Sequence, residues 1–120
     1  MAKINKKIIY DAEEDILFLS KGRKVKASID IGDFIIDIGI GGFVSGIEIL
    51  NASENLKLQE EQLKGLQEAS MAVTYKPDYV CIFLVMKFEG KEKDITIPLT
   101  VDLGHGSMKT EKISFAAAQN

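Results

Sequence analysis

The feature that most constrains this fold is a strict alternation of polar and apolar residues between positions 24 and 31. Successive side chains of a β-strand point to opposite faces, so this spacing predicts a strand with one buried and one solvated face. Strands of that kind are typical of antiparallel sheets, which commonly bury only one of their faces. The apolar members of the alternation are Val25, Ala27, Ile29 and Ile31.

Four further short apolar segments flank this strand, at residues 8–10, 16–19, 34–38 and 43–49. Short polar or glycine-containing segments separate them, which is the pattern of strands joined by tight turns. We therefore expect the first fifty residues to form a five-stranded antiparallel meander.

A helix is predicted over residues 52–70, where good helix formers replace the strand pattern. Asn51, three residues before Glu54, resembles a capping box at the start of this helix. The apolar stripe is narrow, so we expect a surface helix that packs on a sheet. Leu58 lies off that stripe, and we expect it to be exposed or to meet a partner. The stripe consists of Ala52, Leu56, Leu63 and Leu66.

The last third of the chain returns to strand patterns, over residues 71–101. The segment 79–86 is apolar without a break, which favours a central strand covered on both faces. Pro98 has no amide donor, so its strand should lie at a sheet edge or carry a bulge. Residues 102–120 are expected to form a loop or tail, in which 112–116 could add a short strand.

These patterns predict one domain over residues 1–120, of the α+β class. We expect a mainly antiparallel structure with a five-stranded meander, one helix and about three more strands, arranged as one curled sheet or as a two-layer sandwich. A chain of 120 residues can bury a core without metal or disulfide support. The expected core residues are Ile8, Tyr10, Leu17, Leu19, Val25, Ile29, Phe34, Ile36, Ile47, Ile49, Cys81, Phe83, Val85, Ile97 and Leu99.

Composition argues against several classes of protein. No apolar run approaches the ~20 residues that a membrane span requires. The single cysteine cannot form an internal disulfide, and the lysine-rich start has no signal-peptide core, so we expect a cytoplasmic protein. A net charge of -3 argues against nucleic-acid binding, and we interpret the basic cluster as a solvated face that protects a sheet edge. The cluster consists of Lys3, Lys6, Lys7, Lys21, Arg23, Lys24 and Lys26.

The densest set of metal-type ligands is the acidic turn after the first predicted strand, with Asp11, Glu13, Glu14 and Asp15. A calcium loop supplies oxygen ligands at fixed spacings around a glycine, and this turn has neither that spacing nor a glycine. The better interpretation is a solvated turn that keeps two apolar strands soluble. The alternative is a metal site at Asp11, Glu13 and Asp15. A metal- or small-molecule-dependent enzyme would use these carboxylates or Glu48.

Asp33, Asp37 and Glu48 are the other candidates for acid–base chemistry, which requires carboxyl groups in a shared pocket. Strand parity places Asp37 and Glu48 opposite their apolar neighbours, so we expect both to face water. The glycines at 39–42 do not match the dinucleotide-binding spacing, because a strand rather than a helix is expected to follow them. A hairpin turn explains these glycines.

The single histidine and the single cysteine do not predict a reactive site. His105 has no second histidine or cysteine near it in sequence, so we expect a loop residue rather than a zinc ligand. Cys81 lies inside an apolar segment, and we expect a buried small hydrophobe rather than a nucleophile. No cofactor, metal or catalytic residue is therefore predicted.

Two motifs occur together, Tyr-Asp-Ala-Glu-Glu-Asp at 10–15 and Gly-Ile-Glu-Ile-Leu-Asn-Ala-Ser at 46–53. In this order they resemble the prokaryotic family known as domain of unknown function 2283, over about residues 4–53. The uncharged turn at 39–42 departs from the acidic second turn of that family, and residues 71–120 have no counterpart in its short members. The resemblance implies no activity. Some relatives resemble the antitoxin half of small gene pairs, which would imply a protein partner.

We predict a non-enzymatic interaction or assembly module, because meander sheets expose edges that soluble proteins commonly cover by forming symmetric dimers. The expected partner is a second copy of the chain, or another protein, rather than nucleic acid or a membrane. Leu58 and Pro98 are the expected contact residues. The alternatives are an antitoxin-like partner-neutralising protein and an enzyme that uses the acidic turn.

Overall fold

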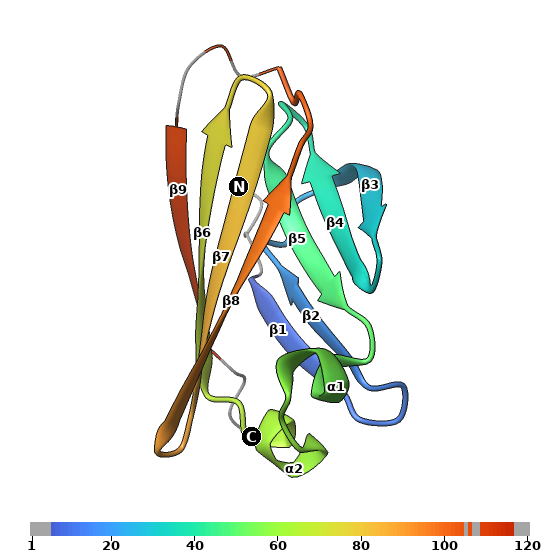
Figure 1. Cartoon of the computed structure of the whole chain (residues 1–120), viewed down its shortest axis with the longest axis vertical. Helices are drawn as coiled ribbons and strands as arrows, with labels where there is room; N and C mark the ends of the chain where they lie inside the picture. Colours follow the sequence, from blue (N-terminus) through green and yellow to red (C-terminus); the bar gives the residue numbers. More distant parts are fainter. Residues whose placement is uncertain (1–5, 105, 107–108, 117–120) are drawn as a thin grey trace.

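The computed structural model describes residues 6–104, 106 and 109–116, which form two antiparallel sheets that face each other (Figure 1). Within the described chain, the first sheet has five strands in the order β1-β2-β5-β4-β3 and the second has four in the order β8-β7-β6-β9. The helices α1 (Ala52–Leu56) and α2 (Glu60–Lys64) connect the sheets and lie at one end of them (Figure 1). The predicted α+β class with mainly antiparallel strands is confirmed.

The strands of the first sheet are β1 (Lys7–Asp11), β2 (Ile16–Ser20), β3 (Val25–Ile31), β4 (Phe34–Gly39) and β5 (Val44–Ile49). Those of the second are β6 (Glu68–Lys76), β7 (Tyr79–Phe88), β8 (Lys91–Leu99) and β9 (Lys109–Ala116). Of the two alternatives for residues 102–120, a loop or tail and an added strand over 112–116, the structure has the strand, and β9 begins earlier than expected, at Lys109. This strand pairs with β6 because its alternate residues Ile113 and Phe115 are buried in the core.

The first sheet is not a consecutive meander, because β5 lies between β2 and β4. Gly46 permits this insertion, since it faces Ser20 on β2 and Asp37 on β4. A Cβ atom at this position would lie 2.6 Å from the carbonyl oxygen of Leu19. Only a residue without a side chain allows two backbones to approach so closely, so the contact explains the first residue of the second motif.

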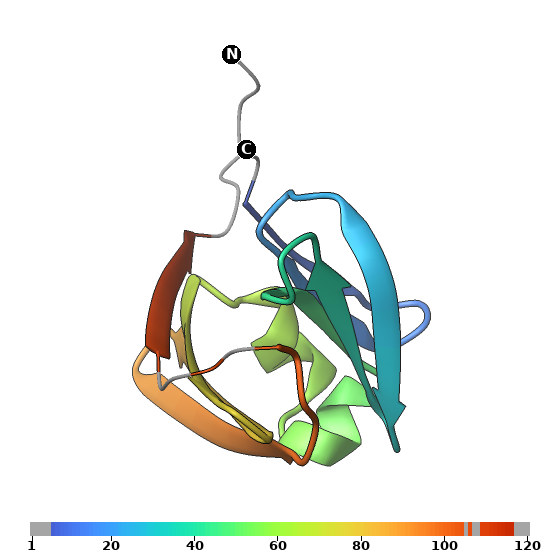
Figure 2. The same cartoon turned by 90° about the horizontal axis from the view of Figure 1, so that it is seen from above.

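The two sheets enclose one apolar core, and the arrangement is a two-layer sandwich rather than one curled sheet (Figure 2). The edge strands β1 and β9 contact each other along one side. Four of the predicted core residues are partly buried and pack against the core from the first sheet: Ile8, Tyr10, Ile29 and Phe34. The predicted core residues that are fully inside it are Leu17, Leu19, Ile36, Ile47, Ile49, Ile97 and Leu99.

Four residues that we predicted to lie in the core do not lie there. Val25 is 44% exposed because it begins an edge strand whose register shifts before Ala27. The other three, Cys81, Phe83 and Val85, point away from the core on β7. An unbroken apolar segment carries no alternation, so its parity could not be read from the sequence. The inward residues of this strand are Val80, Ile82, Leu84, Met86 and Phe88.

The single helix predicted over 52–70 is also wrong, since α1 and α2 are separate and β6 already begins at Glu68. Lys57 ends α1 in a left-handed conformation with φ 53°. A capping box between Gln59 and Gln62 begins α2, whereas the box predicted at Asn51 is not formed. The break lets Leu58 pack against the core. No helix in the described part of the chain is long and apolar enough to cross a membrane.

A buried polar network joins the two sheets. Lys21, which follows β2, is only 5% exposed, and its Nζ lies 2.5 Å from Oε1 of Glu111 on β9. The Tyr75 hydroxyl donates to the same Glu111 oxygen at 3.1 Å and accepts the backbone N–H of Val44 at 2.8 Å. Burial and the nearby carboxylate raise the pKa of Tyr75, so it remains a neutral donor. Lys21 is therefore not part of a solvated basic face.

The close backbone contact at Gly46 predicts a specific loss of stability. Gly46→Ala should lower the free energy of unfolding by at least about 1 kcal/mol, because strands β2 and β5 must separate to admit the methyl group. The matched control is Gly65→Ala, whose Cβ would lie no closer than 3.5 Å to another atom and whose φ is -92°. Chemical denaturation measures both, and equal effects of the two variants would contradict the explanation.

Candidate interaction face

The acidic turn, the leading metal candidate of the sequence, holds the first sheet to α1. The Tyr10 hydroxyl donates to Asp15 Oδ1 at 2.7 Å, and the Ser53 hydroxyl donates to Asp15 Oδ2 at 2.6 Å. The backbone N–H of Ser53 also donates to this carboxylate, at 3.1 Å. Burial alone would raise the pKa of Asp15, but the hydrogen bonds from Ser53 and Tyr10 together outweigh it and lower the pKa. We call this arrangement the Asp15 clasp.

The remaining acidic residues of the turn also have local roles. Asp11 Oδ1 accepts the backbone N–H groups of Glu13 and Glu14, at 3.0 and 3.2 Å, which organises the turn. Glu13 and Glu14 themselves are exposed to solvent. Among the residues that the structure describes, no three or more His, Cys, Asp or Glu side chains are grouped so that they could hold a metal ion.

The three carboxylates considered for acid–base chemistry do not share a pocket. Asp33 Oδ2 accepts the side-chain amide of Asn55 at 2.9 Å, beside the start of α1. Asp37 accepts the Ser28 hydroxyl at 2.8 Å on the outer face of the first sheet. Glu48 lies on that same face, as strand parity predicted. Burial, and to a lesser degree the Asp37 charge, raise the pKa of Glu48.

The glycine, histidine and cysteine predictions have different outcomes. Gly41 and Gly42 take φ values of 89° and 80° in the β4–β5 turn, as a hairpin requires. His105 lies outside the described residues, as does Lys3 of the basic cluster. Cys81 is not a buried hydrophobe but a half-buried residue on the outer face of the second sheet.

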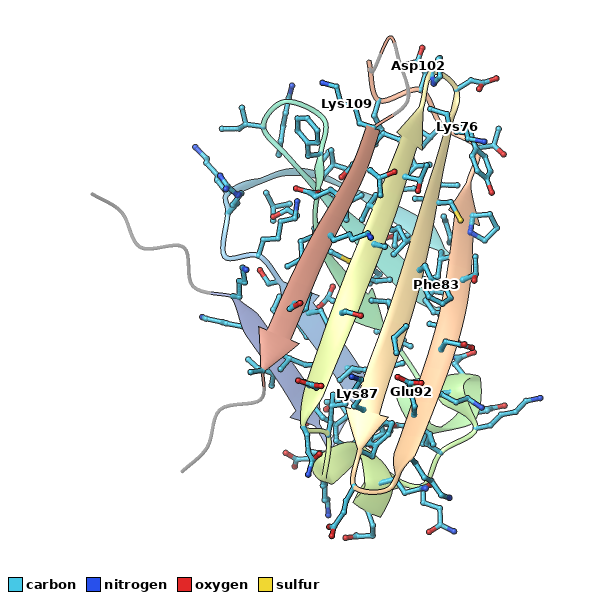
Figure 3. The ribbon with its side chains drawn as sticks, turned by 90° about the vertical axis from the view of Figure 1, so that its left-hand side faces the viewer. Lys76, Phe83, Lys87, Glu92, Asp102 and Lys109 are labelled. Atoms are coloured by element: carbon cyan, nitrogen blue, oxygen red, sulfur yellow. The ribbon has the colours of Figure 1, made fainter. Side chains whose placement is uncertain are left out.

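The outer face of the second sheet is the feature that sequence reasoning missed. Phe83 projects from the middle of β7 and is 41% exposed (Figure 3). Thr96 on β8 and Ala72 on β6 lie beside it, and Cys81 with Pro98 forms the neighbouring pair along the strand. We call this surface the Phe83 face. Its central residues are Ser70, Ala72, Thr74, Cys81, Phe83, Val85, Thr96 and Pro98, all of them uncharged.

Charged residues of the Phe83 face lie at its ends and on its edge strands, where Asp94 on β8 is paired with Val85 and Lys112 on β9 is paired with Ala72. At one end, Lys87 Nζ is 3.3 Å from Glu68 Oε1 and Lys87 also faces Glu92 across the ladder. At the opposite end, Lys76 Nζ lies 5.9 Å from the centre of the Tyr79 ring. Figure 3 shows this distribution, with Lys76 at one end, Phe83 at mid-length and Lys87 at the other. An uncharged centre with a charged rim is the anatomy of a protein interface.

The outer face of the first sheet has a different character. Its apolar residues Ile9 and Phe18 are paired across β1 and β2, and Phe18 faces Glu48 in the next strand. Asp37 lies on the same face, one ladder step from Glu48. Carboxylates therefore lie among the apolar residues of this face, whereas the centre of the Phe83 face has none.

The predicted contact residues are placed differently by the fold. Pro98 lies on β8, an edge strand as predicted, and its exposed side chain belongs to the Phe83 face. Leu58 is partly buried and packs against the core, away from that face. The sequence feature that could have revealed this face is the unbroken apolar segment 79–86. Only every second residue of a strand can point into the core, so the apolar residues between them had to lie on the outer face.

These features define a class: a small antiparallel sandwich whose N-terminal sheet is held to α1 by the Asp15 clasp and whose second sheet has an outer face with an uncharged centre. Residues 7–53 match the family model described as "Protein of unknown function (DUF2283)". The chain is 30% identical over 85 residues to a Methanosarcina mazei protein named "Putative hypoxanthine phosphoribosyltransferase", a match that covers 70% of this chain and 69% of that protein. It is 34% identical over 91 residues to an uncharacterized protein of Methanocaldococcus jannaschii, covering 74% and 78%.

The chain therefore belongs to the DUF2283 family of proteins of unknown function. The match begins at β1 and ends at Ser53, so it contains the whole first sheet and both partners of the Asp15 clasp. No solved structure matches the chain at a significant level.

The Asp15 clasp predicts a pH-dependent contribution to stability. Asp15→Asn should destabilise the fold at pH 7 by about 1 kcal/mol, because the charged acceptor of the Ser53 and Tyr10 hydrogen bonds is lost. Asparagine tolerates the φ of 57° at this position, so backbone strain does not confound the comparison.

The sign of the pH effect follows from the lowered pKa of Asp15. The carboxylate stabilises the fold above its unfolded pKa of about 4, and this contribution is lost as the pH falls through the folded pKa. The difference in Tm between the wild type and Asp15→Asn should therefore shrink below about pH 4. Glu13→Gln in the same turn is the control, and a difference that does not vary with pH would refute the clasp.

Proposed function

We propose that this protein is a non-enzymatic assembly module that forms a homodimer through the Phe83 face. The observation that carries the proposal is the exposed Phe83 at the centre of an uncharged sheet surface. Aromatic side chains in the middle of a flat, uncharged patch commonly contribute most of the binding energy of an interface. The assembly is expected to act in the cytoplasm.

The charges on β6 favour a second copy as the occupant. Glu68 and Lys76 project from opposite ends of this strand on the same face. If two sheets stack with their strands antiparallel about a twofold axis through Phe83, Glu68 of each chain faces Lys76 of the other. The contacts between Glu68 and Lys76 favour this stacking, and the same axis brings Lys112 of one chain near Lys112 of the other, a like-charge contact that the uncharged centre must outweigh.

The size of the face also suits a dimer. Four strands spaced about 4.8 Å apart and nine residues of about 3.3 Å each give a face of roughly 19 by 30 Å. The flat area of that rectangle is roughly 570 Å², and side-chain relief brings its accessible surface close to the ~800 Å² that each partner of a standard interface buries. Edge strands on either side need not pair for such a contact to form.

The Methanosarcina mazei relative is named as a transferase of phosphoribosyl groups. A site for such groups needs clustered cations, which the uncharged centre of the Phe83 face does not supply, so this name bears on other parts of the molecule and not on the face. The face therefore supports assembly rather than that reaction. Capture of a different protein, as in an antitoxin-like role, is the competing use of the same surface.

Phe83→Asp is expected to convert the dimer to a monomer, with the dimer Kd raised at least ~100-fold, because each chain loses an apolar anchor and buries a carboxylate. Light scattering coupled to size-exclusion chromatography measures the mass. Circular dichroism verifies that the variant remains folded, as its exposed position leads us to expect.

The matched control is Ile9→Asp, which places the same side chain on the outer face of the first sheet at a residue that is 50% exposed. This variant should remain dimeric. A wild-type protein that is monomeric at high micromolar concentration would overturn the proposal, and so would a dimer that Ile9→Asp dissociates while Phe83→Asp does not.

The antiparallel arrangement predicts a charge-reversal rescue. Glu68→Lys and Lys76→Glu should each weaken the dimer roughly 3–10-fold, because each creates a like-charge contact. The double variant Glu68→Lys/Lys76→Glu should restore the affinity of the wild type. Eight residues of strand, about 26 Å, separate the two positions within one chain, so rescue can arise only between chains. Additive losses in the double variant would reject the antiparallel stacking.

A further inference from the structure

A cavity of about 570 Å³ lies against the first sheet, with Glu111 as the lining residue from the second sheet. The β4–β5 turn that borders it lies at the end of the molecule opposite the helices (Figure 1). The segment after β2, the β4–β5 turn and the edge strand β9 contribute its walls. This volume lies within the range of sites for small molecules. The residues that matter for its chemistry are Lys21, Arg23, Lys24, Ile40, Phe43 and Glu111.

The cavity is basic although the chain as a whole carries a net charge of -3. Its one lining carboxylate, Glu111, already binds Lys21 and Tyr75 and is therefore neutralised. Arg23 and Lys24 form no ion pair within the described residues, and both are exposed at the rim. Two adjacent cations of this kind suit a doubly charged anion, because the Arg guanidinium can bind two oxygens at once.

The opposite wall of the cavity is apolar. Ile40 is 72% exposed at the tip of the β4–β5 turn, which makes it the most exposed of the large apolar side chains described. The Phe43 ring stands edge-on to Tyr75, with 5.3 Å between ring centres, and Lys109 Nζ lies 5.8 Å from the centre of the Phe43 ring. Figure 3 shows Lys109 at the start of β9.

We propose that this cavity binds a small organic phosphate that carries a planar ring. Arg23 and Lys24 hold the phosphate, and Ile40 and Phe43 contact the ring. The partly buried Lys21–Glu111 pair lines the cavity and links the two sheets, so the backbone segments that carry the cations and the apolar wall are held together before the ligand binds. This site is separate from the Phe83 face and does not depend on the dimer.

Isothermal titration calorimetry with AMP, inorganic phosphate and adenosine tests the proposal. AMP should bind at least ~10-fold more tightly than either fragment, because only AMP engages both walls. The double variant Arg23→Gln/Lys24→Gln should weaken AMP binding at least ~10-fold, and Ile40→Asp should also weaken it. Lys91→Gln/Lys93→Gln, which removes two cations from β8, is the matched control and should leave the affinity unchanged.

Each other outcome counts against the site. If AMP does not bind at millimolar concentration, the cavity has no such ligand. If phosphate alone binds as tightly as AMP, the apolar wall has no role, and if adenosine does, the cations have none. Equal losses in the β8 control would indicate nonspecific attraction. None of these results bears on the oligomeric state, which is measured with Phe83→Asp, so failure of the two proposals can be distinguished.

Discussion

The structure depends on one constraint: each sheet has a single apolar face, and these two faces can leave water only by packing against each other. Leu19, Ile36 and Ile47 on one side, and Ile82 and Leu84 on the other, have no exposed surface. The helices and the β1–β9 contact close two borders of this layer. Where the sheets diverge, the Lys21–Glu111 ion pair and the Tyr75 hydroxyl supply polar contacts between the layers.

The same constraint explains why the outer faces differ. A residue that points outward does not pack in the core, so contact with solvent or with a partner determines which side chain suits its position. On the first sheet this freedom gives a mixed surface, with Glu48 beside Phe18 and Asp37 on the next strand. On the second sheet it gives an uncharged surface around Phe83. The two candidate sites therefore lie where core packing makes no demand: on one outer face, and beside the β4–β5 turn.

Sequence patterns predicted the first sheet well because polar residues mark its faces. The alternation from Val25 to Ile31 located a strand, although only its second half, at Ile29 and Ile31, is partly buried, and the parity of Glu48 located its face. Along 79–86 no polar residue marks a face, so Phe83 was assigned to the wrong side. The cavity could not be predicted, since Arg23 and Phe43 approach through tertiary structure alone. The two-helix break depends on the left-handed Lys57, which helix propensity does not reveal.

The Asp15 clasp has a consequence for the architecture of the family. Ser53 is the last residue of the family match, and its hydroxyl donates a hydrogen bond to the carboxylate of Asp15, near the start of the match. Side chains of the N-terminal sheet region therefore link its two ends. The segment that follows α1 is therefore attached to a sheet whose ends are already linked. The apolar face of that sheet, with Leu17, Leu19 and Ile47, must still be covered by another layer. Here strands β6–β9 form the covering layer. In a homologue that lacks them, a different C-terminal extension or a neighbouring molecule must cover the same apolar face.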